Sequence, residues 1–309
     1  MTSPRNDERG QVLVLTVLAL TVLLGMTALV LDVGGWFRTQ RRLQGTADAA
    51  ALAGAQALPA DPGNANSLAL NYAGLNGGGV AAADVAITST NQSNDTIFVE
   101  SHKTDPGFFS KIFGIDNVDI HARAKAIVGP PAKAMYVAPM VVDCNHDLIQ
   151  DCDGSHTPIF GQETTLPYDK FGAPGAFGML NLDGGNGTPG ASSEGDWILH
   201  GFSRYLPIGN YNSDPGAKFS SNEIQGALDA RVGTVLLFPV FRTLNGQGSN
   251  AQYEIIGWIG FHLDSYEVHG FNAKLTGYFT EFIAHGIRAE PGDSGSPGTL
   301  GVKTIQLIQ

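Results

Sequence analysis

The sequence predicts an α+β protein: a long N-terminal transmembrane helix, a small helix-and-sheet module, and a β-rich C-terminal domain with two short helices. Three observations support this fold class. An uncharged, apolar stretch lies near the N-terminus. Stretches that alternate apolar and polar residues, typical of strands, follow within residues 84–129. A Gly-Pro-Pro break at 129–131 then precedes a longer region of apolar runs, which makes it the best domain boundary.

The uncharged stretch predicts a helix that spans a membrane. Val12 to Leu31 contains 20 residues, about 30 Å of α-helix, which matches one hydrocarbon core. A cleaved signal peptide, the alternative, has a shorter apolar core of roughly 7–15 residues and a small-residue cleavage site, and no such site follows Leu31. A buried helix of a soluble protein would show a polar face. We therefore expect a cytoplasmic tail over residues 1–10 and a retained anchor over residues 11–33.

The orientation of the anchor rests on two features outside it. The flanking arginines alone lean toward a cytoplasmic C-terminus, because three follow the span and two precede it. However, a tail of about ten residues is a poor functional domain to send across a membrane. Cys144 and Cys152 also lie eight residues apart in a polar loop, as a disulfide in an oxidising compartment would. These two features favour an N-terminus inside and a C-terminal domain outside the membrane.

The helix is expected to continue outside the membrane as a docking helix over residues 34–58. No proline interrupts residues 36–58, and Pro59 is expected to end the helix. The tandem glycines at 34–35 mark a place for a kink. One stripe of small and apolar residues recurs at helical spacing: Leu43, Ala47, Ala50, Gly54 and Leu58. A continuous helix would be about 70 Å long, half in lipid and half packed on a soluble domain.

The residues around this junction resemble a known family. RGQ at 9–11, ALVLDVGGW at 28–36 and RRLQGTADAAALAGAQAL at 41–58 are similar to the N-terminal motif of TadE/TadG-like proteins of the tight-adherence (Tad) Flp-type pilus assembly and secretion system. The resemblance implies a single-pass, pilin-like helper protein, not an enzyme, with other Tad/Flp pilus-assembly proteins as partners. It also implies a C-terminal region outside the cytoplasmic membrane, so we expect the N-terminus inside and the C-terminal domain outside. Leu15 stands where prepilin-peptidase substrates have glutamate, five residues after Gly10, which argues against processing as a major pilin.

The resemblance also implies which motif residues carry interactions. They are Asp32, Leu43, Gln44, Asp48, Ala50, Ala51 and Gly54. Asp32 closes the apolar run, either as a charge at the membrane boundary or as a docking contact with a partner's helix. Asp48 lies among alanines, either as a solvated or locally paired residue or as a recognition position. Trp36 suits the aromatic belt of a membrane interface.

The two remaining regions are read from periodicity and turn residues. Residues 60–128 are expected to form a small module, pilin-like by analogy, with helices over 64–75 and 107–113 and strands over 84–90, 96–102 and 118–129. Residues 132–309 are expected to form a β-rich extracytoplasmic domain, with strands over 134–142, 177–183, 234–241, 253–265, 274–283 and 302–308. Helices fit over 193–206 and 222–232, and the second is expected to begin with a capping box from Ser220 to Glu223.

Composition limits the partners. The net charge is −11, and five of the 18 basic residues precede Leu43, so the remainder is more acidic still. This argues against nucleic acid. The glycines at 184–187 lack the Lys-Ser/Thr that completes a phosphate-binding loop. We expect the lipid bilayer as a partner, and neither a small-molecule substrate nor an organic cofactor.

One segment resembles a catalytic loop. GDSGSP at 292–297 is similar to the nucleophile loop of chymotrypsin-like serine proteases, where Ser294 would attack. That chemistry needs a histidine base and an orienting carboxylate. The nearest preceding histidine, His285, stands at the end of a predicted strand. Gly, Pro, Ser and Asp together are typical of a loop, so we expect no catalytic residue, with a hydrolase as the alternative.

A second segment could hold a metal. DCNHDLIQDCDG at 143–154 places oxygen donors at alternating positions, namely Asp143, Asn145, Asp147, Asp151 and Asp153. Leu148 replaces the glycine of a calcium loop and Gly154 its last glutamate. The segment is therefore either a calcium site or an acidic turn closed by a Cys144–Cys152 disulfide. Zinc held by these cysteines and the nearby histidines would have a spacing unlike the usual fingers.

These observations favour a non-enzymatic, membrane-anchored component of a Tad/Flp-type pilus assembly or secretion apparatus. Helix packing and an extracytoplasmic interaction domain would carry its function. The alternative is a membrane-anchored surface adhesin or carbohydrate-binding β domain.

Overall fold

The computed structural model describes residues 9–169, 178–184, 189–214, 218–247, 250–270, 272–289 and 298–308, with side chains from Val12 onward. Its order of elements confirms the α+β class, with a long N-terminal helix and a β-rich C-terminal region. The chain divides into two compact units, residues 1–127 together with 307–309, and residues 128–306. The division falls beside the Gly-Pro-Pro break at 129–131. The last residues rejoin the first unit, where the backbone N–H of Ile308 donates to the carbonyl of Lys125 at 2.9 Å.

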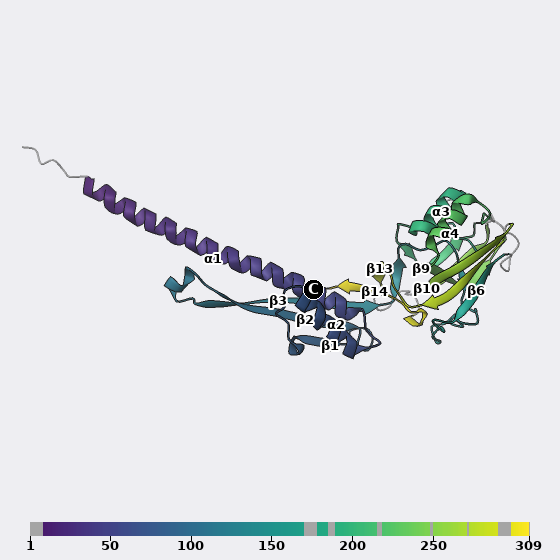
Figure 1. Cartoon of the computed structure of the whole chain (residues 1–309), viewed down its shortest axis with the longest axis horizontal. Coiled ribbons are helices and arrows are strands. Elements are labelled where there is room, and N and C mark those ends of the chain that lie inside the picture. Colours follow the sequence, from purple (N-terminus) through teal and green to yellow (C-terminus); the bar gives the residue numbers. More distant parts are fainter. Residues whose placement is uncertain are drawn as a thin grey trace, which may run out of the picture. The chain divides into compact units, whose positions relative to one another are not determined.

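The first unit begins with α1, one continuous helix over Arg9–Ala55 (Figure 1). It contains both the predicted membrane span and most of the predicted docking helix. It passes through Gly34 and Gly35 without interruption, so the pair does not break the helix. It ends at Ala55, before the predicted limit of Leu58. The N–H groups of residues 56–58 donate to carbonyls three residues earlier, as in turns, and Pro59 disfavours helical backbone in the residue that precedes it.

The membrane-facing part of α1 has the surface that lipid requires. Side chains over Val12–Leu31 are exposed, apart from partial cover at two small residues. The hydroxyls of Thr16, Thr21 and Thr27 each donate to the carbonyl four residues earlier, at 2.8 Å. This pairing leaves these three hydroxyl protons satisfied within the helix, as an apolar surrounding demands. Among the described residues, α1 is the one helix long and apolar enough to cross a membrane.

Three antiparallel strands and a second helix complete the first unit. They are α2 (Pro62–Leu75), β1 (Val85–Thr88), β2 (Thr96–Pro106) and β3 (Asn117–Gly129), in strand order β1-β2-β3. Asp61 begins α2 by accepting from the backbone N–H of Asn64 at 2.9 Å. A 3-10 turn, η1 (Ala82–Asp84), precedes β1. The helix predicted over 107–113 is only a short 3-10 turn, η2 (Ser110–Phe113), because Gly114 ends it in the left-handed conformation with φ of 80°.

The second unit is built on one large sheet with two helices. The sheet has the order β5-β9-β10-β11-β6, and β8 pairs with the start of β10. Their bounds are β5 (Val142–Asp143), β6 (Glu163–Tyr168), β8 (Gly209–Asn212), β9 (Val235–Asn245), β10 (Gln252–His269) and β11 (Asn272–Thr280). The helices are α3 (Ala191–His200) and α4 (Asn222–Arg231). A small sheet joins β13 (Gly286–Arg288), β4 (Pro131–Ala134) and β7 (Leu206–Pro207), while β12 (Phe282–Ile283) pairs with β14 (Val302–Leu307) in parallel. A last 3-10 turn, η4, covers Gly298–Leu300.

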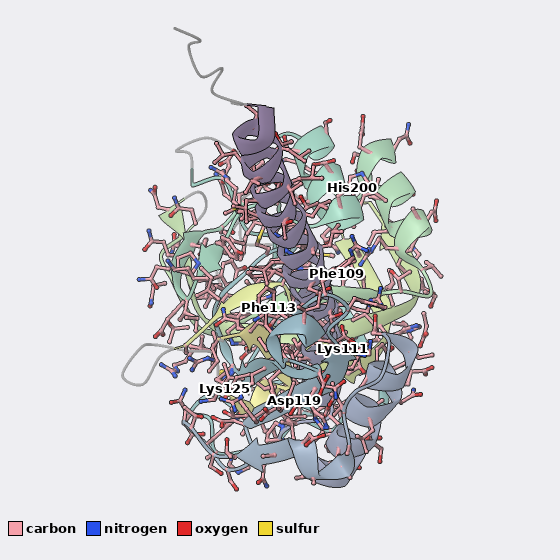
Figure 2. The ribbon with its side chains drawn as sticks, turned by 90° about the vertical axis from the view of Figure 1, so that its left-hand side faces the viewer. Phe109, Lys111, Phe113, Asp119, Lys125 and His200 are labelled. Carbon is pink, nitrogen blue, oxygen red and sulfur yellow. A yellow bond between two sulfur atoms is a disulfide. The ribbon has the colours of Figure 1, made fainter. Side chains whose placement is uncertain are left out.

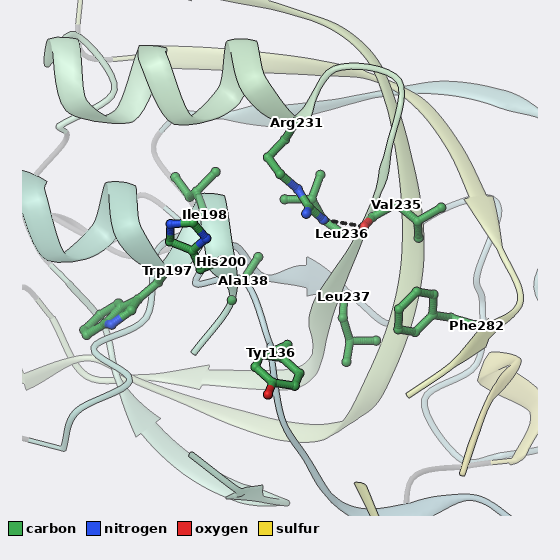
Figure 3. Close-up of a pocket in the computed structure, with 11 residues that line it drawn as sticks. Tyr136, Ala138, Trp197, Ile198, His200, Arg231, Val235, Leu236, Leu237 and Phe282 are labelled. Carbon is green, nitrogen blue, oxygen red and sulfur yellow. Dashed lines mark hydrogen bonds between the residues drawn. The ribbon is translucent and has the colours of Figure 1, made fainter. Parts of the chain in front are cut away.

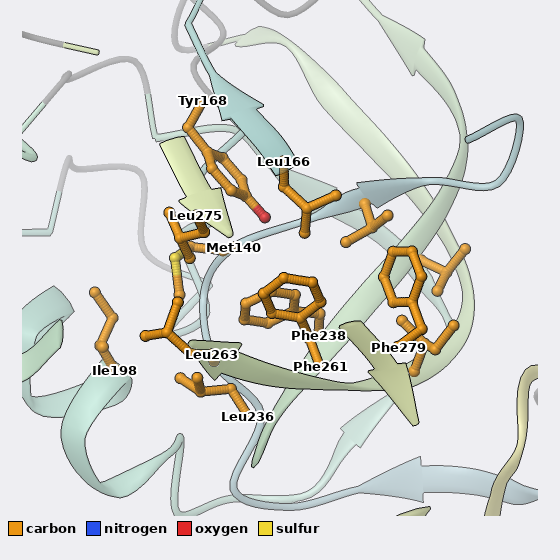
Figure 4. Packing of buried hydrophobic residues seen from close by; sticks show 14 of the residues in the cluster. Met140, Leu166, Tyr168, Ile198, Leu236, Phe238, Phe261, Leu263, Leu275 and Phe279 are labelled. Atoms are coloured by element: carbon orange, nitrogen blue, oxygen red, sulfur yellow. The ribbon is translucent and has the colours of Figure 1, made fainter. Parts of the chain in front are cut away.

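Aromatic side chains form much of the core of this unit (Figure 4). The rings of Phe238 on β9 and Phe261 on β10 stack with centroids 5.3 Å apart. Phe279 on β11 packs edge-on against Phe261 at 5.5 Å. All three are fully buried, so neighbouring strands are joined by side-chain packing as well as by their hydrogen bonds.

Several predicted elements of the second unit are corrected. Residues 134–142 and 178–183 make only isolated bridges, beyond the ends of β4 and β5, and Pro139 cannot donate to a strand ladder. The helix predicted over 193–206 ends at His200, because Gly201 has φ of 73° and a Cβ there would meet the backbone of Tyr136. The capping box is wrong: Ser221, not Ser220, caps α4 by accepting from the N–H of Ile224. The short, polar strands β6, β7 and β8 carry too little apolar pattern to be predicted.

Candidate functional site

The motif stripe on α1 packs against the protein's own module. Leu43, Ala47, Ala50 and Leu58 are buried, as are the alanines of α2 that face the helix. Gly54 makes the closest approach, since a Cβ there would lie 2.4 Å from Cδ1 of Ile97 and 2.8 Å from a backbone oxygen of α2. The stripe consists largely of small residues, which let α2 and strand β2 approach α1 closely.

The polar pair of the motif binds the sheet. The side-chain amide nitrogen of Gln44 donates to Oδ1 of Asp48 at 2.8 Å and to the carbonyl of Arg123, on β3, at 2.9 Å. Asp48 is therefore locally paired, one of the two interpretations open from the sequence. Ala51, one position outside the stripe, is also fully buried. These contacts serve the fold of the first unit itself.

Asp32 lies where the apolar run of α1 ends, and it is buried against a loop of the same unit. Its carboxylate accepts from the backbone N–H groups of Phe108, Phe109 and Ser110, at 3.3, 2.8 and 2.7 Å. Only 5% of its surface is exposed. Three donors on one carboxylate offset the cost of removing it from water. Within the described structure, Asp32 thus serves the contact between α1 and the turn η2.

Two threonines of α1 make further hydrogen bonds to other parts of the first unit. The hydroxyl of Thr39 donates to the carboxylate of Asp105 at the end of β2, and the ammonium of Lys103 lies 2.6 Å from the same carboxylate. Lys103 and Thr39 hold the pKa of Asp105 below its usual value. Farther out, the hydroxyl of Thr46 donates to the carbonyl of Asn76 at 2.7 Å. Trp36 is half-buried and packs against the cluster that Leu43 forms with Ile120 and Ala122 of β3, so it is not wholly free for a membrane interface.

The acidic segment contains a disulfide between Cys144 and Cys152. Because both sulfurs are in this bond, a zinc site using them is ruled out. Among the described residues, one group of three or more acidic, histidine or cysteine side chains has all its ligand atoms within 4.8 Å of one another, and it consists of Asp151, Asp153 and His156. Oδ1 of Asp143 instead accepts from the backbone and side chain of Asn145.

Asp151 is already used by the fold. It is fully buried, and it accepts from the N–H of His156 at 3.1 Å and from the hydroxyl of Thr299. The five predicted calcium ligands therefore do not converge as one ligand set, and Asp147 is not part of the group. Calcium binding at this segment stays a prediction.

A cavity of about 220 Å³ lies in the second unit, below α3 and α4 (Figure 3). Its polar and aromatic lining comes from Tyr136, Trp197, His200, Arg231 and Phe282. The guanidinium of Arg231 donates to the carbonyl of Val235 at 2.5 Å, and burial lowers the pKa of this side chain. Pockets that enclose small molecules usually measure roughly 300–1,000 Å³, so this cavity gives little support to a small-molecule site.

The serine-protease-like segment gives no geometry to assess, because Ser294 and the rest of 292–297 lie outside the described residues. His285 lies in a described segment, where its ring packs edge-on against that of Tyr136 at 5.4 Å. The carbonyl of His285 accepts from the N–H of Met135.

Comparison with known proteins identifies the N-terminal region. Residues 10–57 match the family described as "Putative Flp pilus-assembly TadE/G-like", which confirms the resemblance seen in the sequence. No curated protein and no solved structure is detectably similar to the chain. The match over residues 10–57 and the exposed apolar helix fit a membrane-anchored protein, and the match suggests a structural role rather than an enzymatic one.

Proposed function

We propose that this chain is a non-enzymatic component of a Tad/Flp-type pilus assembly or secretion apparatus in the cytoplasmic membrane. Its N-terminus lies inside, α1 anchors it, and the second unit is presented outside as the interaction domain. The observation that carries this proposal is the family match over residues 10–57, which coincides with α1 and with the contacts that α1 makes.

The division of α1 into two surfaces supports a mechanical role. Its outer half packs on the chain's own α2 and β2, and Leu43 and Gln44 contact β3, so these motif residues stabilise the protein's own fold. The lipid-facing half has no such cover, and there a partner helix has access. A Cβ at Gly25 would meet no other part of the described chain. Helices in lipid associate closely where a small residue lies at the contact.

The test is complementation of a deletion strain with full-length variants, with pili counted by electron microscopy and membrane levels measured by immunoblot. We expect no pili in the deletion strain and full recovery with the wild-type chain. Gly25→Leu should reach normal membrane levels yet restore few pili. Val22→Leu, also in the exposed span, is the matched control and should restore them.

Normal pili in the deletion strain would refute the proposal. If attachment to surfaces were lost in that strain while pili remained, the adhesin alternative would gain support. Orientation is tested separately, by adding protease to intact spheroplasts that carry a tag on the second unit. Protection of that tag would contradict an extracytoplasmic domain.

A further inference from the structure

The loop between β2 and β3 exposes an unusual amount of apolar surface. We define the hairpin loop as residues 107–115, GFFSKIFGI, in which Lys111 is the one charged residue. Its exposed fractions are 77% for Phe108, 42% for Phe109, 81% for Ile112, 67% for Phe113 and 44% for Ile115. Large apolar side chains grouped in this way indicate contact with a membrane or a partner rather than with water.

The hairpin loop has a defined shape that holds these side chains outward. The N–H of Gly107 donates to the carbonyl of Asp116 at 2.9 Å. The hydroxyl of Ser110 donates to the carbonyl of Ile115 at 3.1 Å. A Cβ at Gly107 would collide with Ser110 and with the carbonyl of Ile115, so the two ends of the loop approach as closely as glycine permits.

The contact with Asp32 fixes where the loop lies along α1. Asp32 directly follows the apolar run Val12–Leu31, whose length matches the hydrocarbon core. Since Asp32 binds three N–H groups of residues 108–110, the loop lies beside α1 at the end of that run. Figure 1 shows the β2–β3 hairpin extending beside α1, with its tip toward the N-terminal half of the helix. Figure 2 labels Phe109, Lys111 and Phe113 on this tip.

We propose that the hairpin loop inserts into the same bilayer that α1 spans and packs Phe108, Ile112 and Phe113 at the boundary between headgroups and acyl chains. The occupant of this surface is therefore lipid, because the surface continues the lipid-exposed face of α1. The ammonium of Lys111 lies among these side chains, where it reaches lipid phosphates. The inference rests on the anchor role of α1 given above, and it makes the protein a two-point membrane binder whose hairpin sets the depth of the first unit.

The full-length chain suits a direct test, because both of its cysteines are in the disulfide. A cysteine introduced by Ile112→Cys is then the single thiol for an environment-sensitive NBD fluorophore. Leu75→Cys is the matched control, since Leu75 is similarly exposed, at 73%, on the same unit. Leu75 adjoins Asn76, whose carbonyl accepts from the hydroxyl of Thr46. Thr46 lies about 21 Å farther along α1 than Asp32, so Leu75 is expected to lie well outside the bilayer. Leu24→Cys reports insertion of the span itself.

Each labelled chain is reconstituted into vesicles of phosphatidylethanolamine and phosphatidylglycerol, with and without nitroxide-labelled lipid. We expect blue-shifted emission and at least twofold quenching at positions 112 and 24, and neither effect at position 75. Quenching at position 24 with position 112 behaving like position 75 would overturn the inference while leaving the anchor intact. Absence of quenching at position 24 would overturn both. Shielding of position 112 only after pilus proteins are added would assign the surface to a protein partner and also overturn the inference.

Discussion

The side-chain amide of Gln44 donates to the backbone carbonyl of Arg123 at 2.9 Å, which joins α1 to strand β3 of the first unit. The same nitrogen donates to Asp48 four residues along the helix. The acceptor on the strand is a main-chain carbonyl, so this bond depends on the backbone position of β3 and not on the identity of a side chain. A conspicuous part of the family motif therefore stabilises the chain's own fold, and mutations in it must be interpreted first as changes of stability.

Gly54→Leu should unfold or loosen the first unit. The added side chain meets Ile97 and a carbonyl of α2 at distances that no ordinary Cβ contact shows, and overpacking of this kind costs about 1–3 kcal/mol. Amide hydrogen exchange of β2 and β3 in detergent-solubilised protein measures the loss. Gly45→Leu is the control, because Gly45 lies on the same helix and faces open space. Equal exchange in the two variants would contradict the packing described for Gly54.

Asp95→Asn should loosen the turn before β2 and reduce the acid sensitivity of the first unit. Burial raises the pKa of Asp95, but bonds from the N–H groups of residues 90–92 and from Thr96 outweigh it, so its pKa is lowered overall. Because the folded pKa lies below the unfolded one, this carboxylate stabilises the fold above its ordinary pKa of 3.8. The stabilisation is lost as the pH falls through the folded value.

The measurement for Asp95 is the stability of the β1–β2 hairpin, followed by hydrogen exchange as the pH falls from about 6 to about 3. The wild-type chain should lose more stability over this range than Asp95→Asn. Asp116→Asn, at an exposed position, should keep the wild-type dependence. Identical pH profiles for wild type and Asp95→Asn would count against the role given to this carboxylate.

Asp32→Ala should release the hairpin loop from α1. The substitution removes the acceptor of three N–H groups, and bonds to a charged acceptor contribute about 1.5–3 kcal/mol each. We expect the amides of Phe109 and Ser110 to exchange at least about tenfold faster in nanodiscs, since tenfold corresponds to about 1.4 kcal/mol. Asp48→Ala should leave these two amides unchanged. Slow exchange in Asp32→Ala would show that the loop is held by other contacts.

Lys218→Met should strongly destabilise the second unit. The ammonium lies 3.0 Å from Glu194 and 2.6 Å from Asp214, and both carboxylates are fully buried. Removing one partner of a buried ionic group typically costs about 3–5 kcal/mol, and here two buried carboxylates would lose the cation that lies close to both. Urea unfolding followed by tryptophan fluorescence reports this unit through Trp197 and Trp258. Lys274→Met on an exposed position of β11 should change stability little, and equal midpoints would refute the prediction.

Local features of the sequence were sufficient for much of the first unit. The apolar run, the stripe at helical spacing and the alternation in β2 and β3 each depend on neighbours within one element. For this reason α1, α2 and the three strands lie close to their predicted positions. The strands of the second unit were harder to predict from the sequence, because its sheet pairs β6 with β11 and β8 with β10, which are far apart along the chain. Short polar strands of this kind are selected by their partners rather than by their own pattern.

By itself, the sequence determined that the chain has a membrane-length apolar helix, that the helix continues as a small-sided stripe, and that a TadE/G-like motif covers both. These are properties of composition and spacing along one helix, which the chain carries before it folds. Only the tertiary structure decided what the stripe touches. The partners of Gln44, Asp32 and Gly54 lie dozens of residues away, and chain folding alone brings Arg123, the hairpin loop and Ile97 to them. The exposed apolar side chains of the hairpin loop became meaningful for the same reason, once Asp32 placed them beside the end of the apolar run.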